Sequence, residues 1–372
     1  RASRTVCTHS VGSQPVPRAV LDMMDRRPIW AMPAWVPDEI RDALPSGWDL
    51  VVNDEETDGS GDGAARVAPR VLDAVAEAEV YFGYGIPAQL VDAAPRLAWV
   101  HSGAAGVGSS LTPSLIDRDI VFTNSAGIHA DPMAETVLGM LLFFGRGHHL
   151  AVQNQRASQW NTEPYYEAGA PLSELGASTV GIVGYGGVGK GVARRVASLG
   201  AKVIALKRTE PKPSDKKLAS MAGGALDADV ELVHGEAGLA YLLSRSDAVV
   251  LTVPETDQTR GMIDGGAFSR MKAGAVLINV ARGKVVDEDA LSRALQSGHL
   301  RGAGLDVFSK EPLVAGSPLW GLPNVLVTPH VSAVTRGFWR READLMLHNL
   351  RCYLNGAEPS QWRCVVDQDA GY

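Results

Sequence analysis

Cysteine is scarce in this sequence. The 372 residues include only three, Cys7, Cys352 and Cys364, which are too few and too widely spaced for a disulfide framework or a cysteine metal site. Nine histidines occur without HxxxH or HExxH spacing, so we expect no zinc or other metal. Free cysteines suit a reducing compartment, and we therefore expect a cytoplasmic protein.

Long apolar runs and an excess of positive charge are also absent. The best candidate for a membrane span, residues 136–144, is far shorter than the roughly 20 residues that a spanning helix needs. The 35 Lys and Arg against 42 Asp and Glu give a net charge of −7, which argues against a nucleic-acid or anionic-membrane partner. A chain of this length predicts two domains.

Acidic residues are missing from the first 18 positions, which contain Arg, Ser and Pro. A transit peptide and a trimmed disordered extension share that composition. We expect residues 1–27 to be an unstructured extension.

Short apolar strands alternate with helical patterns along the rest of the chain. The fold class predicted from this alternation is α/β, with two Rossmann-like or flavodoxin-like domains and a deep cleft between them. We expect a discontinuous substrate-binding domain, residues 28–130 and 333–372, and a dinucleotide-binding domain, residues 131–332. Predicted helices cover residues 65–78, 131–159 and 333–354. Predicted strands cover residues 48–52, 80–84, 97–101, 120–124, 180–183, 203–206, 248–253, 275–280, 302–307 and 325–328.

A glycine-rich turn follows the strand at residues 180–183 and opens a helical pattern that stops at Gly200. Its glycines would serve a tight turn, close approach to a pyrophosphate and helix-on-strand packing. The pyrophosphate would lie at the helix N-terminus, where free N–H groups favour an anion. The predicted cofactor-binding residues of this loop are Gly184, Tyr185, Gly186, Gly187, Val188 and Gly189.

The second strand of this unit ends in Lys207 and Arg208. An NAD site usually has Asp or Glu here to accept a hydrogen bond from the ribose 2′-hydroxyl. Two cations suit a 2′-phosphate instead, so we expect NADP(H) to be preferred, with NAD(H) possible. The alternative is that both residues belong to a solvated surface loop.

Three candidate catalytic residues follow predicted strands of the second half: Arg282, Glu311 and His330. Ligands bind at the carboxyl ends of parallel strands, so all three point to one site. Arg282 could bind a substrate carboxylate and polarise its carbonyl. His330 could protonate the developing alkoxide, and Glu311 could orient the imidazole and stabilise its charge. Each residue alone has an ordinary structural explanation, and only together do they indicate carbonyl reduction.

The chain resembles the D-isomer-specific 2-hydroxyacid dehydrogenase family over almost its whole length. The motifs that carry the resemblance are HSGAAGVGSSL, PMAETVLGMLL, VGIVGYGGVGKGVARR, VPETDQTRGMI, INVARGKVVDEDAL, GAGLDVFSKEPL and VLVTPHVSA. The resemblance implies that Arg282, Glu311 and His330 are the catalytic triad of a 2-oxoacid reductase, in character closest to NADPH-dependent glyoxylate/hydroxypyruvate reductases. It also implies a homodimer formed through residues 131–159.

The resemblance implies further binding roles. Asp306 would hold the nicotinamide carboxamide with the backbone at Val280 and Ala281. Other residues would line the adenosine side of the cofactor: Val253, Pro254 and Thr259. The amides of a small-residue loop would hold the substrate carboxylate, as its lack of bulky side chains also indicates: Ala105, Gly106 and Val107.

Some positions depart from the family pattern. Gly108 stands where the family usually has Asp, and Arg336 and Arg340 make the segment after His330 unusually cationic. These two arginines could meet a second anion on the substrate, although a solvated helix face explains them equally. Tyr84 and His101 are candidates for substrate specificity.

Other activities on the same scaffold are alternatives. Glu311 argues against a formate dehydrogenase, which carries a neutral amide at that position. A phosphite dehydrogenase stays open, as does a dinucleotide-sensing corepressor without catalytic activity.

Overall fold

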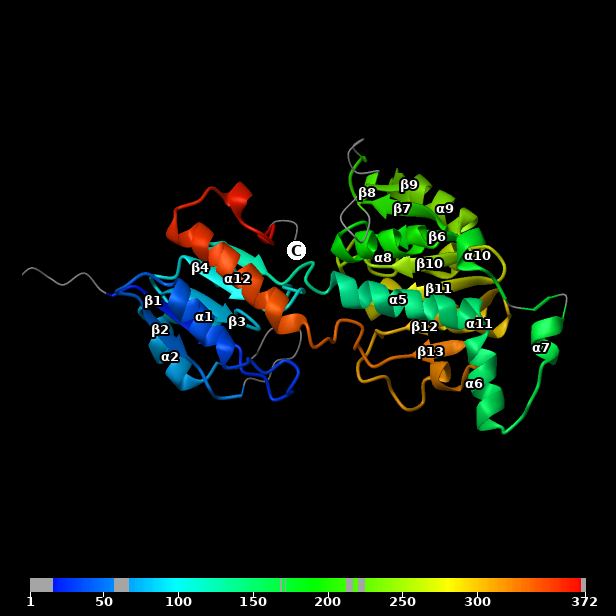
Figure 1. The fold of residues 1–372 in the computed structure, drawn as a ribbon, viewed down its shortest axis with the longest axis horizontal. Helices are drawn as coiled ribbons and strands as arrows, with labels where there is room; N and C mark the ends of the chain where they lie inside the picture. The colour runs from blue at the N-terminus through cyan, green and yellow to red at the C-terminus, as the bar shows by residue number, and fades with distance from the viewer. Residues whose placement is uncertain are drawn as a thin grey trace, which may run out of the picture. The chain divides into compact units, whose positions relative to one another are not determined.

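The computed structural model of the protein describes residues 16–56, 67–167, 169–170, 172–211, 217–219 and 225–368. The chain forms two compact units, Arg1–Ser125 with Trp339–Tyr372, and Ala126–Phe338. Each unit is built on a mainly parallel sheet (Figure 1). The predicted fold class of two Rossmann-like or flavodoxin-like α/β domains is confirmed, whereas the cleft between them stays a prediction.

The first unit contains a five-stranded parallel sheet in the order β2-β1-β3-β4-β5. This is the flavodoxin-like strand order. The strands are β1 (Arg18–Asp22), β2 (Asp49–Val52), β3 (Ala78–Gly83), β4 (Trp99–Ser102) and β5 (Val121–Asn124). The helices are α1 (Trp35–Ala43), α2 (Pro69–Val75), α3 (Ala88–Ala93), α4 (Pro113–Ile116) and α12 (Phe338–Leu354), with the 3-10 turn η5 (Pro359–Gln361).

Strand β1 corrects the prediction for the N-terminus. Residues 18–22 lie within the segment expected to be an unstructured extension, yet they pair with both β2 and β3. Ala19, Val20 and Leu21 have no exposed surface. The apolar run of this strand is only the three residues 19–21, between Arg18 and Asp22, so it gives little signal in the sequence.

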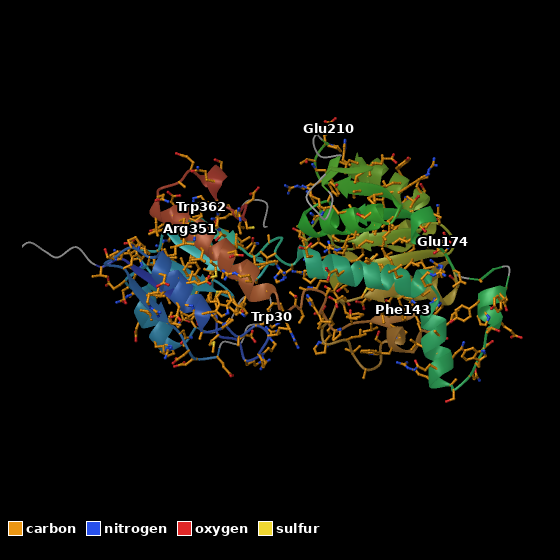
Figure 2. The ribbon with its side chains drawn as sticks, viewed as in Figure 1. Trp30, Phe143, Glu174, Glu210, Arg351 and Trp362 are labelled. Carbon is orange, nitrogen blue, oxygen red and sulfur yellow. The ribbon has the colours of Figure 1, made fainter. Side chains whose placement is uncertain are left out.

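Helix α12 returns from the end of the chain to the first unit. It begins at Phe338, five residues later than predicted, and its aromatic residue Tyr353 lies 5.9 Å from the ring of Trp99. The segment beyond it carries Trp362 (Figure 2), and the centre of its ring lies 5.2 Å from that of Trp99. Tertiary packing of these rings therefore joins the two sequence-distant parts of the unit.

The second unit contains an eight-stranded sheet in the order β13-β12-β11-β10-β6-β7-β9-β8, parallel except for β8. The run from β9 to β12 has the doubly wound order of dinucleotide-binding folds. The strands are β6 (Thr179–Val183), β7 (Lys202–Lys207), β8 (Lys217–Ala219), β9 (Ala225–His234), β10 (Ala248–Leu251), β11 (Ala275–Asn279), β12 (Leu300–Leu305) and β13 (Val325–Val327). The helices are α5 (Ala130–Gly145), α6 (His148–Arg156), α7 (Glu163–Tyr166), α8 (Gly187–Ser198), α9 (Gly235–Arg245), α10 (Gly265–Arg270) and α11 (Glu288–Gln296). Short 3-10 turns are η1 (Leu175–Ala177), η3 (Gly283–Val285) and η4 (Pro318–Gly321).

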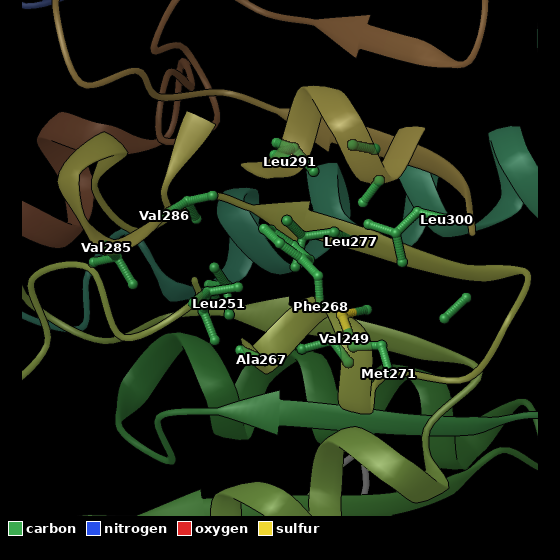
Figure 3. Close-up of a cluster of buried hydrophobic side chains, with 14 of the residues drawn as sticks. Val249, Leu251, Ala267, Phe268, Met271, Leu277, Val285, Val286, Leu291 and Leu300 are labelled. Atoms are coloured by element: carbon green, nitrogen blue, oxygen red, sulfur yellow. The ribbon is translucent and has the colours of Figure 1, made fainter. Parts of the chain in front are cut away.

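Both faces of this sheet are apolar. Successive strand residues point to opposite faces, so Val249 and Leu251 join one buried cluster while Val250 joins another. Figure 3 shows the first cluster, where Phe268 of α10 and Leu291 of α11 gather over the strands. Burial on both faces explains why these strands read as continuous apolar runs rather than alternating ones.

The predicted long helix at residues 131–159 is two helices. Gly147 adopts a left-handed backbone with φ of 68° and separates α5 from α6. Helix α5 lies beside α8 (Figure 1). The buried guanidinium of Arg195 on α8 donates hydrogen bonds to Asp131 and Glu135 of α5. Among the described residues, neither α5 nor any other helix is long and apolar enough to cross a membrane.

Candidate active site

Three of the predicted site residues follow three neighbouring strands of the second unit. Arg282 comes after β11, Glu311 after β12 and His330 after β13, and these strands are adjacent in the sheet. The carboxyl ends of parallel strands share one edge. The topology therefore brings the three residues to the same edge of the sheet.

His330 and Glu311 form a hydrogen-bonded pair. The distance between Nδ1 of His330 and Oε2 of Glu311 is 2.7 Å, and Oε1 of Glu311 accepts a hydrogen bond from the Phe308 N–H at 2.9 Å. The His330 side chain is 49 % exposed, and its Nε2 has no hydrogen-bond partner in the part of the chain that is described. Glu311 thus fixes one ring nitrogen while the other can exchange a proton with a bound molecule.

The turn that carries Arg282 is held by Asn279, a residue that the sequence did not single out. The buried Asn279 side chain donates to the Arg282 carbonyl at 3.1 Å and accepts from the Ala281 N–H at 3.0 Å. The Arg282 guanidinium donates to the Ala281 carbonyl at 2.8 Å. Asn at the end of an apolar strand was the available signal, because such a side chain commonly organises the following turn.

Gly283 brings this turn against the loop of Glu311. A Cβ atom on Gly283 would lie 1.8 Å from the carbonyl carbon of Phe308 and 2.2 Å from the Ser309 nitrogen. Only glycine permits such an approach of two backbones. The Ser309 N–H is itself held by Glu288 of α11 at 2.5 Å.

Asp306 is fully buried at the end of β12. Its carboxylate accepts hydrogen bonds from the Thr328 hydroxyl and from the N–H groups of Val331 and Ser332. Its contact with a nicotinamide carboxamide stays a prediction.

The glycine loop has the local geometry that the motif requires. Gly184 has φ of 106°, and a Cβ on Gly189 would lie 2.0 Å from the Gly184 carbonyl oxygen. A Cβ on Gly186 would meet nothing within 4 Å, so this side of the loop is open at the start of α8. The tight turn, the open approach and the close packing are three separate requirements of a dinucleotide site, and the loop fits that ligand. Of its other members, Tyr185 is buried, with the Lys190 ammonium 5.8 Å from its ring centre.

Lys207 lies at the carboxyl end of β7, where its register partner on β9 is His234. Arg208 follows and is exposed. A surface hollow nearby is lined partly by Glu210, labelled in Figure 2, and by His234. No carboxylate occupies the last position of β7, in agreement with the sequence.

The residues predicted for the adenosine side differ in their surroundings. Thr259 uses its hydroxyl within its own turn, donating to the Pro254 carbonyl at 2.6 Å and accepting from the Thr256 N–H at 2.8 Å. Val253 is half-buried, whereas Val280 is buried directly after β11. The Thr259 side chain thus shapes the turn, and its contact with a cofactor stays a prediction.

The predicted substrate loop lies in the first unit, after β4. Among the described residues, the N–H groups of Ala105, Gly106 and Val107 have no hydrogen-bond acceptor. The Asn124 side chain holds the Ala105 carbonyl at 2.9 Å, and the Val107 side chain is buried. Three consecutive unpaired N–H groups on an anchored loop can bind an anion.

Tyr84 and His101, the candidates for substrate specificity, are both buried. The Tyr84 hydroxyl donates to the Trp30 carbonyl at 2.5 Å, and burial raises the pKa of the Tyr84 phenol. His101 is fully buried, and its Nε2 lies 2.9 Å from Oε1 of Glu342 on α12. The Glu342 carboxylate also accepts a hydrogen bond from the Ser125 hydroxyl. A role of either residue in substrate specificity stays a prediction, because adjacency to a strand end does not reveal which face a side chain occupies.

Arg336 and Arg340, the two cationic residues after His330, have different surroundings. Arg340 of α12 binds the Glu39 carboxylate through two nitrogens at 2.8 Å and stacks on Trp35 at 4.6 Å. Its guanidinium is therefore committed within the first unit and not to a substrate anion. Arg336 is exposed.

Known proteins resemble the chain in sequence and in fold. A family model for the NAD-binding domain of D-isomer specific 2-hydroxyacid dehydrogenases matches residues 138–332. A glyoxylate reductase from Thermococcus gammatolerans is 35 % identical over 278 residues, which are 74 % of this chain and 78 % of that protein. An (S)-sulfolactate dehydrogenase from Chromohalobacter salexigens is 36 % identical over 235 residues, 63 % of this chain and 70 % of that protein.

Solved structures agree. A D-isomer specific 2-hydroxyacid dehydrogenase from Xanthobacter autotrophicus, in complex with NADPH and MES, has a TM-score of 0.74 at 28 % identity, covering 96 % of this chain and 100 % of that one. An NADPH-dependent glyoxylate/hydroxypyruvate reductase from Sinorhizobium meliloti, in complex with NADP and sulfate, has a TM-score of 0.70 at 26 % identity, covering 96 % and 99 %. The chain therefore belongs to the D-isomer-specific 2-hydroxyacid dehydrogenase family, a family of NAD(P)-dependent oxidoreductases.

Proposed function

We propose that the protein reduces a 2-oxoacid to a D-2-hydroxyacid with His330 as the acid/base. The observation that carries the proposal is the 2.7 Å pair of His330 and Glu311 at the strand edge where Arg282 also lies. Imidazolium Nε2 donates the proton that the carbonyl oxygen gains on reduction, and the Glu311 carboxylate stabilises the ring while it is charged. Bound nicotinamide would supply the hydride.

Arg282 has the chemistry to bind the carboxylate of the oxoacid. A guanidinium offers a planar pair of donors that matches a carboxylate, and it polarises a neighbouring carbonyl. In the first unit, the unpaired N–H groups of Ala105, Gly106 and Val107 would bind an anionic group of the substrate. Glyoxylate and hydroxypyruvate are the first substrates to test, because relatives of both kinds are named for them.

The glycine loop and the end of β7 would hold the cofactor. Gly184, Gly186 and Gly189 fit the pyrophosphate, and Lys207 with Arg208 fit a 2′-phosphate, so NADP(H) is preferred and NAD(H) possible. NADPH and NADP in the two solved relatives support this preference.

A homodimer is part of the proposal. Helices α6 and α7 extend away from the sheet of the second unit (Figure 1), and this extension carries Trp160 and Tyr166, which are 96 % and 84 % exposed. Large aromatic residues so exposed are typical of an interface. A second copy of the chain is the partner that we propose.

A turnover assay tests the activity. Purified protein is mixed with NADPH or NADH and glyoxylate, hydroxypyruvate or longer 2-oxoacids, and the chiral product is resolved by chromatography. We expect oxidation of NADPH and, where the product is chiral, the D-isomer. Oxidation of phosphite with NADP, without oxoacid reduction, would support the phosphite alternative, and no turnover with any substrate would support a non-catalytic dinucleotide sensor.

A further inference from the structure

Asp306 holds the chain on both sides of His330. Its carboxylate accepts hydrogen bonds from the Thr328 hydroxyl at 2.6 Å, the Val331 N–H at 2.9 Å and the Ser332 N–H at 2.9 Å. Its backbone carbonyl accepts the His330 N–H at 2.8 Å. One buried residue at the end of β12 thus binds the segment 328–332 at four points.

His330 needs this support because its backbone is in the left-handed region, with φ of 56°. Residues other than glycine adopt that region rarely, and such a conformation persists when the surrounding structure over-determines it. The hydrogen bonds to Asp306 flank this position and supply the constraint. Without these hydrogen bonds, the backbone at His330 could also adopt an extended conformation, which would turn the imidazole away from Glu311.

We infer that Asp306 is a positioning residue whose buried carboxylate holds His330 in register with Glu311. This inference rests on the proposed acid/base role of His330. This role is separate from the carboxamide contact expected for Asp306, because the three hydrogen bonds run to the His330 segment itself and leave the carboxylate with acceptor capacity.

Asp306→Asn is the test variant. It changes the volume little, but an amide nitrogen donates and cannot accept, so a donor would face the N–H of Val331 or Ser332. Hydrogen exchange followed by mass spectrometry on peptides that contain residues 328–332 gives a readout that is independent of turnover. We expect exchange at these amides to accelerate at least about tenfold, with unchanged exchange in the glycine loop.

Kinetics and equilibrium binding complete the experiment. A misplaced catalytic group costs about 10²-fold in rate, so kcat should fall by about that factor together with the faster exchange at residues 328–332. Asp264→Asn is the matched control, because Asp264 also accepts from a backbone N–H, at Ala267, but caps α10 and has no hydrogen bond to residues 328–332 among the described residues. Its kcat and exchange at residues 328–332 should stay at the wild-type values, since Asn is an equally good cap.

Thr328 provides a second route if Asp306→Asn does not fold. Thr328→Val removes the hydroxyl donor and Thr328→Ser keeps it, so only the first should lower kcat and loosen the segment. A rise in the Kd for NADPH with wild-type kcat and unchanged exchange would overturn the inference in favour of cofactor binding. Wild-type turnover in His330→Ala would refute the proposed acid/base role. If His330→Ala loses turnover but Asp306→Asn keeps the wild-type kcat, only the positioning role of Asp306 is refuted.

Discussion

The backbone of Gly283 lies against the backbone of Phe308 so closely that a Cβ atom at position 283 would stand 1.8 Å from the Phe308 carbonyl carbon. This contact joins the turn after β11 to the loop after β12. It therefore connects Arg282, on the first segment, with Glu311, on the second. The arrangement of the candidate site depends on a residue that has no side chain of its own.

Gly283→Ala should damage both stability and activity. The methyl group cannot be accommodated without moving one backbone, and overpacking of this kind costs about 1–3 kcal/mol. Urea unfolding should report the loss of stability, and steady-state kinetics should report a lower kcat. Gly316→Ala is the control, because a Cβ there would meet nothing within 4 Å. Equal behaviour of the two variants would show that the close contact does not matter.

Neutralising the end of β7 should change cofactor preference. A charge-assisted hydrogen bond to phosphate contributes about 1.5–3 kcal/mol, so Lys207→Gln with Arg208→Gln should lower the ratio of kcat/KM for NADPH over NADH by about 10- to 100-fold or more. Lys202→Gln, an exposed change at the opposite end of the same strand, should leave the ratio unchanged. Equal losses for NADPH and NADH would show that neither side chain recognises the 2′-phosphate.

Much of this site could be predicted because its chemistry is local in sequence. The glycine turn, Lys207 and the three strand-end residues each follow an apolar run, and parallel topology places strand ends at one edge. Asp306 and Glu288 were assigned no such structural role, since what they hold lies on other segments. Their hydrogen bonds appear only when β11, β12 and β13 are aligned.

The fold shows the same limit. Apolar runs predicted the central strands. The apolar run of β1, residues 19–21, is only three residues long and does not stand out. Gly147 separates α5 from α6 where the apolar pattern had predicted a continuous helix. The burial of His101 depends on α12, which lies 241 residues away in sequence at Glu342. Contacts of that separation leave no periodic signal.

The buried Glu342 should be a stability residue with an effect on substrate affinity. Its carboxylate accepts from Ser125, which in turn contacts the carbonyls of Ser102 and Ala104 at the start of the substrate loop. Glu342→Gln should destabilise the protein by about 1–3 kcal/mol, measured by urea unfolding, and raise KM for the oxoacid. The exposed change Glu358→Gln should do neither. Wild-type stability and wild-type KM in Glu342→Gln would rule out both the stabilising role and the effect on substrate affinity.

Placing a charge on the exposed extension should weaken the proposed dimer. Trp160→Glu should shift the sedimentation velocity profile toward the monomer, because it puts a charge into an apolar interface. Leu199→Glu introduces the same charge at another exposed apolar position of the second unit and should leave the profile unchanged. A wild-type protein that sediments as a monomer at micromolar concentration would contradict the dimer itself.

The central claim is that His330, held by Glu311 at 2.7 Å, transfers the proton in oxoacid reduction. Single-turnover oxidation of bound NADPH by His330→Ala, with NADPH affinity measured on the same sample, tests it most directly. General acid catalysis accounts for about 10²- to 10⁴-fold in rate, so the oxidation rate should fall by that factor while the Kd for NADPH is unchanged. A wild-type oxidation rate in this variant would contradict the account.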